Sequence, residues 1–214
     1  MADSVTLTPP IVMTLDHLAR RWRGARPLLS AFALLSRGRP VEVSEIAEAA
    51  GASIDQIEKA LTSARSARDD AGRVTDLFGM TLAAAPHRLE IGQATTFACC
   101  ALWAHTIPRL VGLVARIDSE EPGSGQRVRL TVSPNGLDSV QTPGASAVLA
   151  VAERWEIEAN VGRAFCGHVR HFASRHNAEE FAAAAPTRHV VELAQLDAAA
   201  RFLHTAIMSA SATA

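Results

Sequence analysis

Two amphipathic segments joined by a very short turn constrain the fold of this chain most strongly. Residues 44–50 have helical spacing and stop at Gly51, and Ser53 then begins a second helix. Ser53 and Gln56 form an S-x-x-Q pattern, in which each side chain can bond the backbone N–H of the other residue at a helix N-terminus. A helix, a short glycine-containing turn and a second helix predict a helix-turn-helix.

The flanking segments extend this motif to a winged helix. Residues 12–22 carry apolar side chains at three- and four-residue steps, which predicts an arm helix, and another helix is expected from Pro27. Two β-like runs at residues 76–83 and 87–91 follow the motif, as expected of a wing. The second helix of the motif places acidic side chains where a DNA-binding protein usually places basic or amide ones. We therefore expect DNA binding to be less favoured than a packing or partner-binding role.

Strand-like and helical stretches alternate after residue 91. Residues 95–106 have helical spacing, residues 128–132 alternate as a half-buried strand, and residues 164–172 have the pattern of another strand. Further strands are expected at residues 147–151 and 190–193, and helices at residues 153–160, 177–185 and 197–208. We predict an α+β chain, in which a winged helix-turn-helix precedes a mixed α/β domain with small antiparallel sheets and flanking helices.

This pattern predicts three parts. They are an N-terminal arm helix at residues 1–26, the winged helix-turn-helix at residues 27–91, and a domain carrying the cysteines at residues 92–214.

The composition excludes several classes of protein. The 214 residues include 21 basic and 22 acidic side chains, so no global field attracts nucleic acid or an anionic membrane. No apolar run reaches the roughly 20 residues that span a bilayer, and no secretory signal is visible at the N-terminus. We therefore expect a cytoplasmic protein without membrane association.

The cysteines are the strongest candidates for chemistry. Three cysteines, two of them adjacent, cannot build a disulfide framework, which indicates a reducing compartment and a thiol-dependent task. On a helix, Cys99, Cys100 and Trp103 would lie within one turn, and on a strand Cys166 and His168 would point to one side. If these two faces meet, thiolates and an imidazole would converge on one soft cation. Spacing alone leaves open the alternative that the cysteines only pack in the core.

Several separated motifs resemble the alkylmercury (organomercurial) lyase family. They are RGRPV before the helix-turn-helix, FACCALWAHTIPRLVG after the wing, and then VRLTVSP and AFCGHVRHFAS. The resemblance covers the chain from about residue 27 to the end, and the last two motifs are the most specific. It implies a lyase-like domain for residues 92–214.

The resemblance implies an enzyme that cleaves the carbon–mercury bond of organomercurials by protonolysis. It places the two cysteines that hold mercury at Cys100 and Cys166. Soft thiolates suit a soft metal, and two of them on mercury weaken its bond to carbon. A nearby acid must then protonate the leaving carbon, and in the family this is an aspartate three residues after the first cysteine.

This chain departs from the family at that aspartate, because Trp103 occupies its position and an indole cannot exchange a proton. If the chain remains a lyase, Cys99, His168 or His105 must relay the proton. The alternatives are a non-catalytic protein that binds a soft metal or organometal, and a metal-responsive winged-helix DNA-binding regulator. Trp103 is also compatible with a filled, inert pocket.

The resemblance implies no required cofactor, with mercury(II) or another soft metal as substrate, product or ligand. The expected partners are an organomercurial or a soft metal ion, small thiols, and a downstream metal acceptor. Apart from the relay role considered for His105, we expect surface or ordinary packing positions for His105, His171, His176, His189 and His204. A solvated face is expected for Arg154, Arg163 and Arg170.

Overall fold

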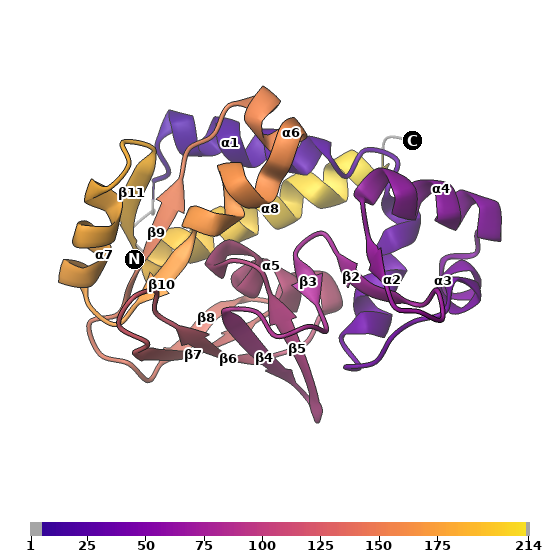
Figure 1. Cartoon of the computed structure of the whole chain (residues 1–214), viewed down its shortest axis with the longest axis horizontal. Helices are drawn as coiled ribbons and strands as arrows, with labels where there is room; N and C mark the ends of the chain where they lie inside the picture. The colour runs from indigo at the N-terminus through magenta and orange to yellow at the C-terminus, as the bar shows by residue number, and fades with distance from the viewer. Residues whose placement is uncertain (1–5, 213–214) are drawn as a thin grey trace.

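The structure, a computed structural model, describes residues 6–212 (Figure 1). It confirms the predicted class, because a helix-turn-helix precedes a mixed α/β region with antiparallel sheets. The helices are α1 (Pro9–Arg20), η1 (Arg26–Leu28), α2 (Leu29–Leu35), α3 (Val43–Ala50), α4 (Ile54–Ala64), α5 (Ala101–Val111), α6 (Arg154–Ala164), η2 (Cys166–His168), α7 (Arg175–Ala183) and α8 (Leu193–Ala212), where η marks a 3-10 helix. The strands are β1 (Ala67–Arg68), β2 (Val74–Leu77), β3 (Met80–Thr81), β4 (His87–Ile91), β5 (Ala94–Ala98), β6 (Ala115–Glu120), β7 (Arg127–Ser133), β8 (Gly136–Val140), β9 (Ser146–Ala150), β10 (Arg170–Phe172) and β11 (Arg188–Glu192).

Helices α3 and α4 form the predicted helix-turn-helix. Gly51 ends α3 in the left-handed conformation, with φ of 62°, which suits glycine at a helix C-terminus. At the start of α4 the Gln56 N–H donates to Ser53 Oγ at 3.2 Å, and the Ser53 N–H donates to Gln56 Oε1 at 2.8 Å. The predicted capping box is therefore confirmed. Ile46 and Ile57 are fully buried, so each helix turns an apolar side chain into the core.

The wing belongs to a larger antiparallel sheet of eight strands, in the order β1-β2-β3-β5-β4-β6-β7-β8. The run predicted at residues 76–83 contains a tight hairpin between β2 and β3. Its turn residues, Phe78 and Gly79, both have positive φ, 47° and 92° respectively. The sheet continues across residue 91, while the division into residues 1–26, 27–91 and 92–214 stays a prediction.

A second sheet and the long helix α8 complete the fold. The second sheet has three antiparallel strands in the order β10-β9-β11. Figure 1 shows α8 crossing the molecule between α1 and α5, and it contacts both of them. Leu15 of α1 and Leu203 of α8 are buried in one continuous apolar core. Within residues 6–212, no helix is long and apolar enough to cross a membrane.

Two predicted elements near the cysteines are wrong. Residues 95–106 do not form one helix, because the β-branched and aromatic residues at 95–97 extend β5 and α5 begins only at Ala101. Residues 164–172 do not form one strand, because Cys166–His168 is a 3-10 turn and β10 begins at Arg170. Gly167 sits tightly in this turn, where an added Cβ would lie 3.0 Å from the carbonyl oxygen of Gly162.

Helix α7 also begins earlier than the sequence predicts. Its N-cap is Ser174, whose Oγ accepts the backbone N–H of Asn177 at 3.2 Å. Asn177, the first residue of the predicted helix, therefore lies inside the first turn, and Ser174 is the residue that caps α7.

Candidate metal centre

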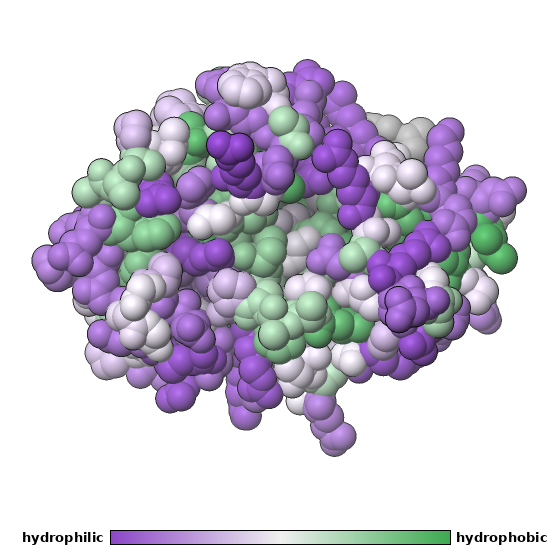
Figure 2. Space-filling view, viewed as in Figure 1, coloured by the Kyte–Doolittle hydropathy of each residue, from purple (hydrophilic) through white to green (hydrophobic). Residues whose placement is uncertain are grey.

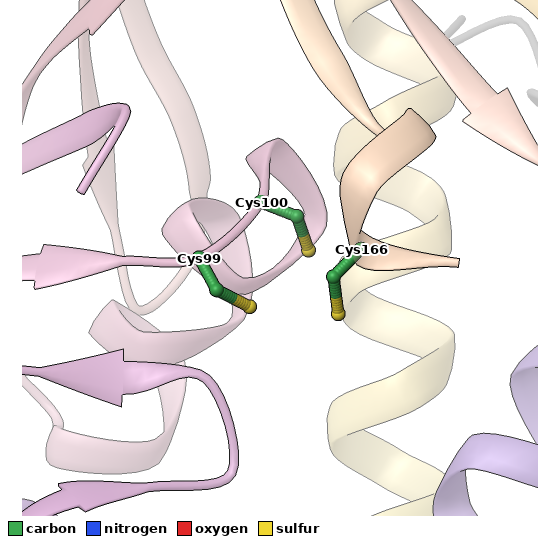
Figure 3. Close-up of side chains that lie close together, drawn as sticks. All are labelled: Cys99, Cys100 and Cys166. Carbon is green, nitrogen blue, oxygen red and sulfur yellow. The ribbon is translucent and has the colours of Figure 1, made fainter. Parts of the chain in front are cut away.

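Three thiols converge at the start of α5 (Figure 3). The Sγ atoms of Cys99, Cys100 and Cys166 all lie within 4.8 Å of one another. Cys99 and Cys100 join β5 to α5, and Cys166 begins η2, so the cluster brings together segments that are far apart in sequence. Cys100 and Cys166 are buried, whereas Cys99 is only partly buried. This arrangement can hold a soft metal ion with sulfur ligands.

Two hydrogen bonds to backbone carbonyl groups hold the two halves of this cluster together. The Ala101 N–H donates to the Val169 carbonyl at 3.1 Å, which ties α5 to the segment after Cys166. Arg170 Nη1 donates to the Cys99 carbonyl at 2.8 Å. The expectation that Arg170 lies on a solvated face is therefore wrong, since its side chain reaches back to the thiol cluster.

The three thiols differ in protonation. Although burial opposes it, hydrogen bonds from the Cys166 and Cys99 thiols hold the pKa of Cys100 well below its usual value, helped by the Trp103 backbone and the Arg170 charge. The hydrogen bond to Cys100 raises the pKa of Cys99 well above its usual value, and it does the same for Cys166. Ionisation of the cluster is therefore most favoured at Cys100, where the two neighbouring thiols stabilise the thiolate.

Trp103 forms an aromatic wall beside the thiols. Its ring centroid lies 6.0 Å from that of Trp22 and 6.3 Å from that of Phe32, and only 5% of the residue is exposed. Gly79 makes room for it, because a Cβ at that glycine would lie 2.6 Å from Trp103 Cδ1 and 2.9 Å from Cys99 Sγ. The residue at the aspartate position therefore shapes the site but offers no ionisable group.

The prediction that Cys166 and His168 share a strand face is wrong, because both lie in the 3-10 turn. His168 Nδ1 instead accepts hydrogen bonds from the Arg188 guanidinium, at 2.9 Å from Nη2 and 3.2 Å from Nε. Burial and the Arg188 charge lower the pKa of His168. The residue lines a separate pocket together with Trp155.

His105, the other histidine considered as a proton donor, lies 3.4 Å through Nδ1 from Asp197 Oδ1 and is fully buried. Of the three donors predicted from the sequence, Cys99 is the one that the structure places among the clustered sulfur atoms.

A basic pocket lies next to the cluster, and sequence reasoning did not identify it. It has a volume of about 760 Å³, and its lining includes Arg21, Arg23, Arg26, Lys59 and Phe78. The hydrogen bond to Cys100 raises the pKa of Cys166, and the Arg21 charge partly opposes this rise, so the guanidinium is within electrostatic range of the cluster. Four basic residues within a short stretch after α1 and on α4 were visible in the sequence, but only the fold shows that they border one pocket.

Apolar side chains gather in a hollow at the centre of the face drawn in Figure 2, and hydrophilic side chains surround it. In the same view of Figure 1, the start of α5 and the segment between α6 and β10 lie near this centre.

Comparison with family models accounts for most of the chain. Residues 80–205 match the model described as alkylmercury lyase, and residues 11–77 match the helix-turn-helix domain of alkylmercury lyase. The helix-turn-helix is therefore part of the architecture of this family, and its presence does not require a regulatory role.

Comparison with individual proteins agrees with the models. The alkylmercury lyase of Staphylococcus epidermidis is 36% identical over 157 residues, which cover 73% of this chain and 69% of that protein. The alkylmercury lyase of Bacillus cereus is 30% identical over 179 residues, which cover 80% and 79%. The mercury-bound form of MerB2 has the same fold, with a TM-score of 0.72 at 16% identity over 91% of this chain and 99% of that one. From these matches, the chain belongs to the alkylmercury lyase family.

Proposed function

We propose that this protein is an organomercurial lyase in which Cys100 and Cys166 hold mercury and Cys99 supplies the proton. The observation that carries the proposal is the cluster itself, in which three sulfur atoms lie within 4.8 Å of one another. Because the neighbouring thiols favour ionisation at Cys100, the cluster can provide a nucleophile, a second ligand and an acid in one place.

The first step is capture of the organomercurial. In a cell rich in thiols the substrate is an adduct, R–Hg–SR′. The Cys100 thiolate attacks mercury and displaces R′S⁻, which gives R–Hg–S-Cys100. Because the neighbouring thiols lower the pKa of Cys100 and favour its thiolate, this exchange requires no separate base.

The second step breaks the carbon–mercury bond. The Cys166 sulfur joins mercury and its proton leaves, so that two thiolates donate electron density to the metal. The Cys99 S–H then protonates the carbon, which leaves as R–H with the electron pair of the broken bond. Mercury(II) stays on Cys100 and Cys166, and Cys99 is left as a thiolate beside it.

The third step transfers mercury to small thiols. One R′SH and one R′S⁻ take the metal as Hg(SR′)₂, and the cluster regains its two protons, one from R′SH and one from outside the site. The net reaction is R–Hg–SR′ plus R′SH giving R–H plus Hg(SR′)₂. Mercury is substrate and product here, and we propose that the reaction requires no resident cofactor.

The basic pocket supports small anionic thiols as partners. Its lining includes the cationic side chains of Arg21, Arg23, Arg26 and Lys59, which attract carboxylates. Arg21, which lines this pocket, is within electrostatic range of Cys166, so the pocket is suited to hold a thiol that exchanges mercury with the cluster. A downstream protein that accepts mercury could use the same surface.

A second candidate function is binding of a soft metal without cleavage. The observation that favours it is Trp103, which leaves the usual acid position without an ionisable group. In this function Cys100 and Cys166 retain an organomercurial whose organic group stays attached.

Hydrocarbon release distinguishes the two functions. Purified protein is incubated with phenylmercury acetate and excess thiol, and benzene is measured by gas chromatography. The lyase should release benzene continuously, and Cys100→Ser and Cys166→Ser should abolish the release. His168→Gln is a matched control and should retain it, because that side chain bonds Arg188. Release no faster than from buffer with thiol alone would contradict the proposal.

A further inference from the structure

A continuous chain of hydrogen-bonded side chains joins β4, β6, β10, α5 and α8. His87 Nδ1 lies 2.8 Å from Ser119 Oγ, and the same oxygen lies 2.8 Å from His171 Nδ1. His171 Nε2 lies 3.2 Å from His105 Nε2. His105 Nδ1 then faces Asp197 Oδ1 at 3.4 Å. We call these five residues the relay; the three rings and Ser119 are fully buried.

Asp197 fixes the direction of every hydrogen bond in the relay. Although burial opposes it, hydrogen bonds from His105 and Arg109 lower the pKa of Asp197, so it is a carboxylate and only accepts. The His105 Nδ1–H must therefore donate to it, which leaves His105 Nε2 as an acceptor. It follows that the His171 Nε2–H donates to His105.

The same reasoning extends to the inner end. His171 Nδ1 is an acceptor and receives the Ser119 hydroxyl proton. The Ser119 oxygen in turn accepts the His87 Nδ1–H. His87 Nε2 then carries no proton and can only accept a hydrogen bond. This buried atom has no hydrogen-bond partner among the residues that the structure describes. A buried acceptor without a partner destabilises a fold, so it marks a place where a transient partner is expected.

The inner end of the relay lies next to the strand that leads into the thiol cluster. His87 on β4 is paired with Ala98, the last residue of β5, after which the chain continues directly into Cys99 and Cys100. Arg170 donates to the Cys99 carbonyl. Its charge assists the hydrogen bonds that lower the pKa of Cys100, and it assists burial in lowering the pKa of His87. At the other end, the Asp197 side chain is 16% exposed and gives access to solvent.

We propose that the relay is a proton shuttle between the thiol cluster and Asp197. Outward transfer begins when His87 Nε2 takes a proton and the His87 Nδ1 proton moves to Ser119 Oγ. The Ser119 hydroxyl proton moves to His171 Nδ1, and the His171 Nε2 proton moves to His105 Nε2. The His105 Nδ1 proton then passes to Asp197 and to solvent, so one proton leaves and no ring remains charged.

Outward transfer reverses every hydrogen bond, and the reversed chain is set to carry one proton inward. This matches the needs of the thiols, a correspondence that rests on the proposed function. Cys166 loses a proton when its sulfur joins mercury, and the cluster needs one from outside when mercury leaves. One outward and one inward transfer per turnover return the relay to its resting direction without rotation of a buried ring.

The tautomers of the buried histidines test the relay in the wild-type protein. Long-range ¹⁵N–¹H NMR spectra distinguish Nδ1–H from Nε2–H imidazoles. The relay requires neutral rings, with His87 and His105 protonated on Nδ1 and His171 protonated on Nε2. Any of the three rings in the other tautomer would break the chain of donors and overturn the proposal.

Proton release during mercury capture tests its use. Phenylmercury acetate is mixed with protein in weak buffer containing a pH indicator, in a stopped-flow instrument. Ser119→Ala removes the central hydroxyl and should slow the proton release about tenfold or more, without changing the number of protons released. Ser146→Ala is the matched control, since this buried hydroxyl donates to the Ser174 carbonyl outside the relay and should leave the rate unchanged. A Ser119→Ala rate within about twofold of wild type would overturn the shuttle.

These results separate the shuttle from the proposed lyase activity. Capture releases a proton whether or not the carbon–mercury bond is cleaved, so absence of benzene contradicts only the lyase. Thermal unfolding of Ser119→Ala and Ser146→Ala establishes that both variants are folded. If Ser119→Ala does not fold, the tautomers of the wild-type protein still decide the proposal.

Discussion

Replacing Cys99 with alanine should separate mercury binding from bond cleavage. The Cys99 sulfur lies within 4.8 Å of the sulfur atoms of Cys100 and Cys166, the proposed mercury ligands. The hydrogen bond to Cys100 raises the pKa of Cys99, which favours its protonated form. General acid catalysis contributes about 10²–10⁴-fold to a rate, equivalent to about 3–5 kcal/mol of barrier. Cys99→Ala should lower the rate of benzene release by that factor.

The same variant should bind mercury normally, because Cys100 and Cys166 remain. Loss of one partly buried sulfur costs only about 1 kcal/mol of folding stability, so the fold should persist. The assay is a single turnover with phenylmercury acetate, in which benzene and protein-bound mercury are measured in one sample. Cys99→Ser is a control that keeps the volume but replaces the thiol with a far weaker acid. Benzene release by Cys99→Ala within about tenfold of wild type would show that the proton comes from another group.

Three further predictions concern stability. Gly79→Ala should lower the free energy of unfolding by about 1–3 kcal/mol, because the new Cβ would meet the Trp103 indole and the residue has a φ of 92°. Denaturant titrations measure this change, and an unchanged midpoint of unfolding would contradict the contact. Trp103→Asp removes a buried indole and should lower the free energy of unfolding by about 3–5 kcal/mol or more. Because of this loss of stability, we do not expect the change by itself to give a faster enzyme, and a stable variant with higher activity would refute that expectation. Burial lowers the pKa of each relay histidine, so these rings are neutral when folded but titrate near pH 6.5 when unfolded. Their contribution to the free energy of unfolding is therefore complete above about pH 6.5. It decreases as the pH falls below this value, by up to about 1.4 kcal/mol per pH unit for each ring. A free energy of unfolding that stays constant from about pH 7 to 5 would contradict buried neutral histidines.

Local signals predicted the N-terminal fold well. The Ser53 and Gln56 capping box and the left-handed Gly51 are determined by residues a few positions apart, so they can be recognised without knowing the tertiary structure. The helix-turn-helix and the α+β class followed from these and from the hydrophobic period.

Local signals failed around the thiols. Residues 95–106 have helical spacing, but pairing with β3 and β4 makes their first part a strand, and no periodicity within the segment reports that pairing. The turn at Cys166 depends on how Gly167 fits against the end of α6. His168 therefore does not share a strand face with Cys166, contrary to the prediction from strand phase, although the three cysteines do converge.

Long-range contacts account for the parts of the site that sequence reasoning missed. Gly79 lies opposite Trp103, and Arg170 donates to the Cys99 carbonyl. In each of these two pairs, the residues are far apart in the sequence. His171 was expected in ordinary packing, but the fold places it between Ser119 and His105. Residue types and spacing predict which groups can react, whereas the fold decides which of them meet.

The mass of the protein after one turnover shows whether the carbon–mercury bond is cleaved and mercury is retained. Wild-type protein is mixed with less than one equivalent of phenylmercury acetate without added thiol, and native mass spectrometry measures what stays bound while benzene is quantified in the same sample. If the protein is a lyase, its mass should increase by the mass of mercury alone, and one benzene should be released for each mercury retained. A mass increase of phenylmercury without benzene would contradict cleavage and leave a protein that binds organomercurials.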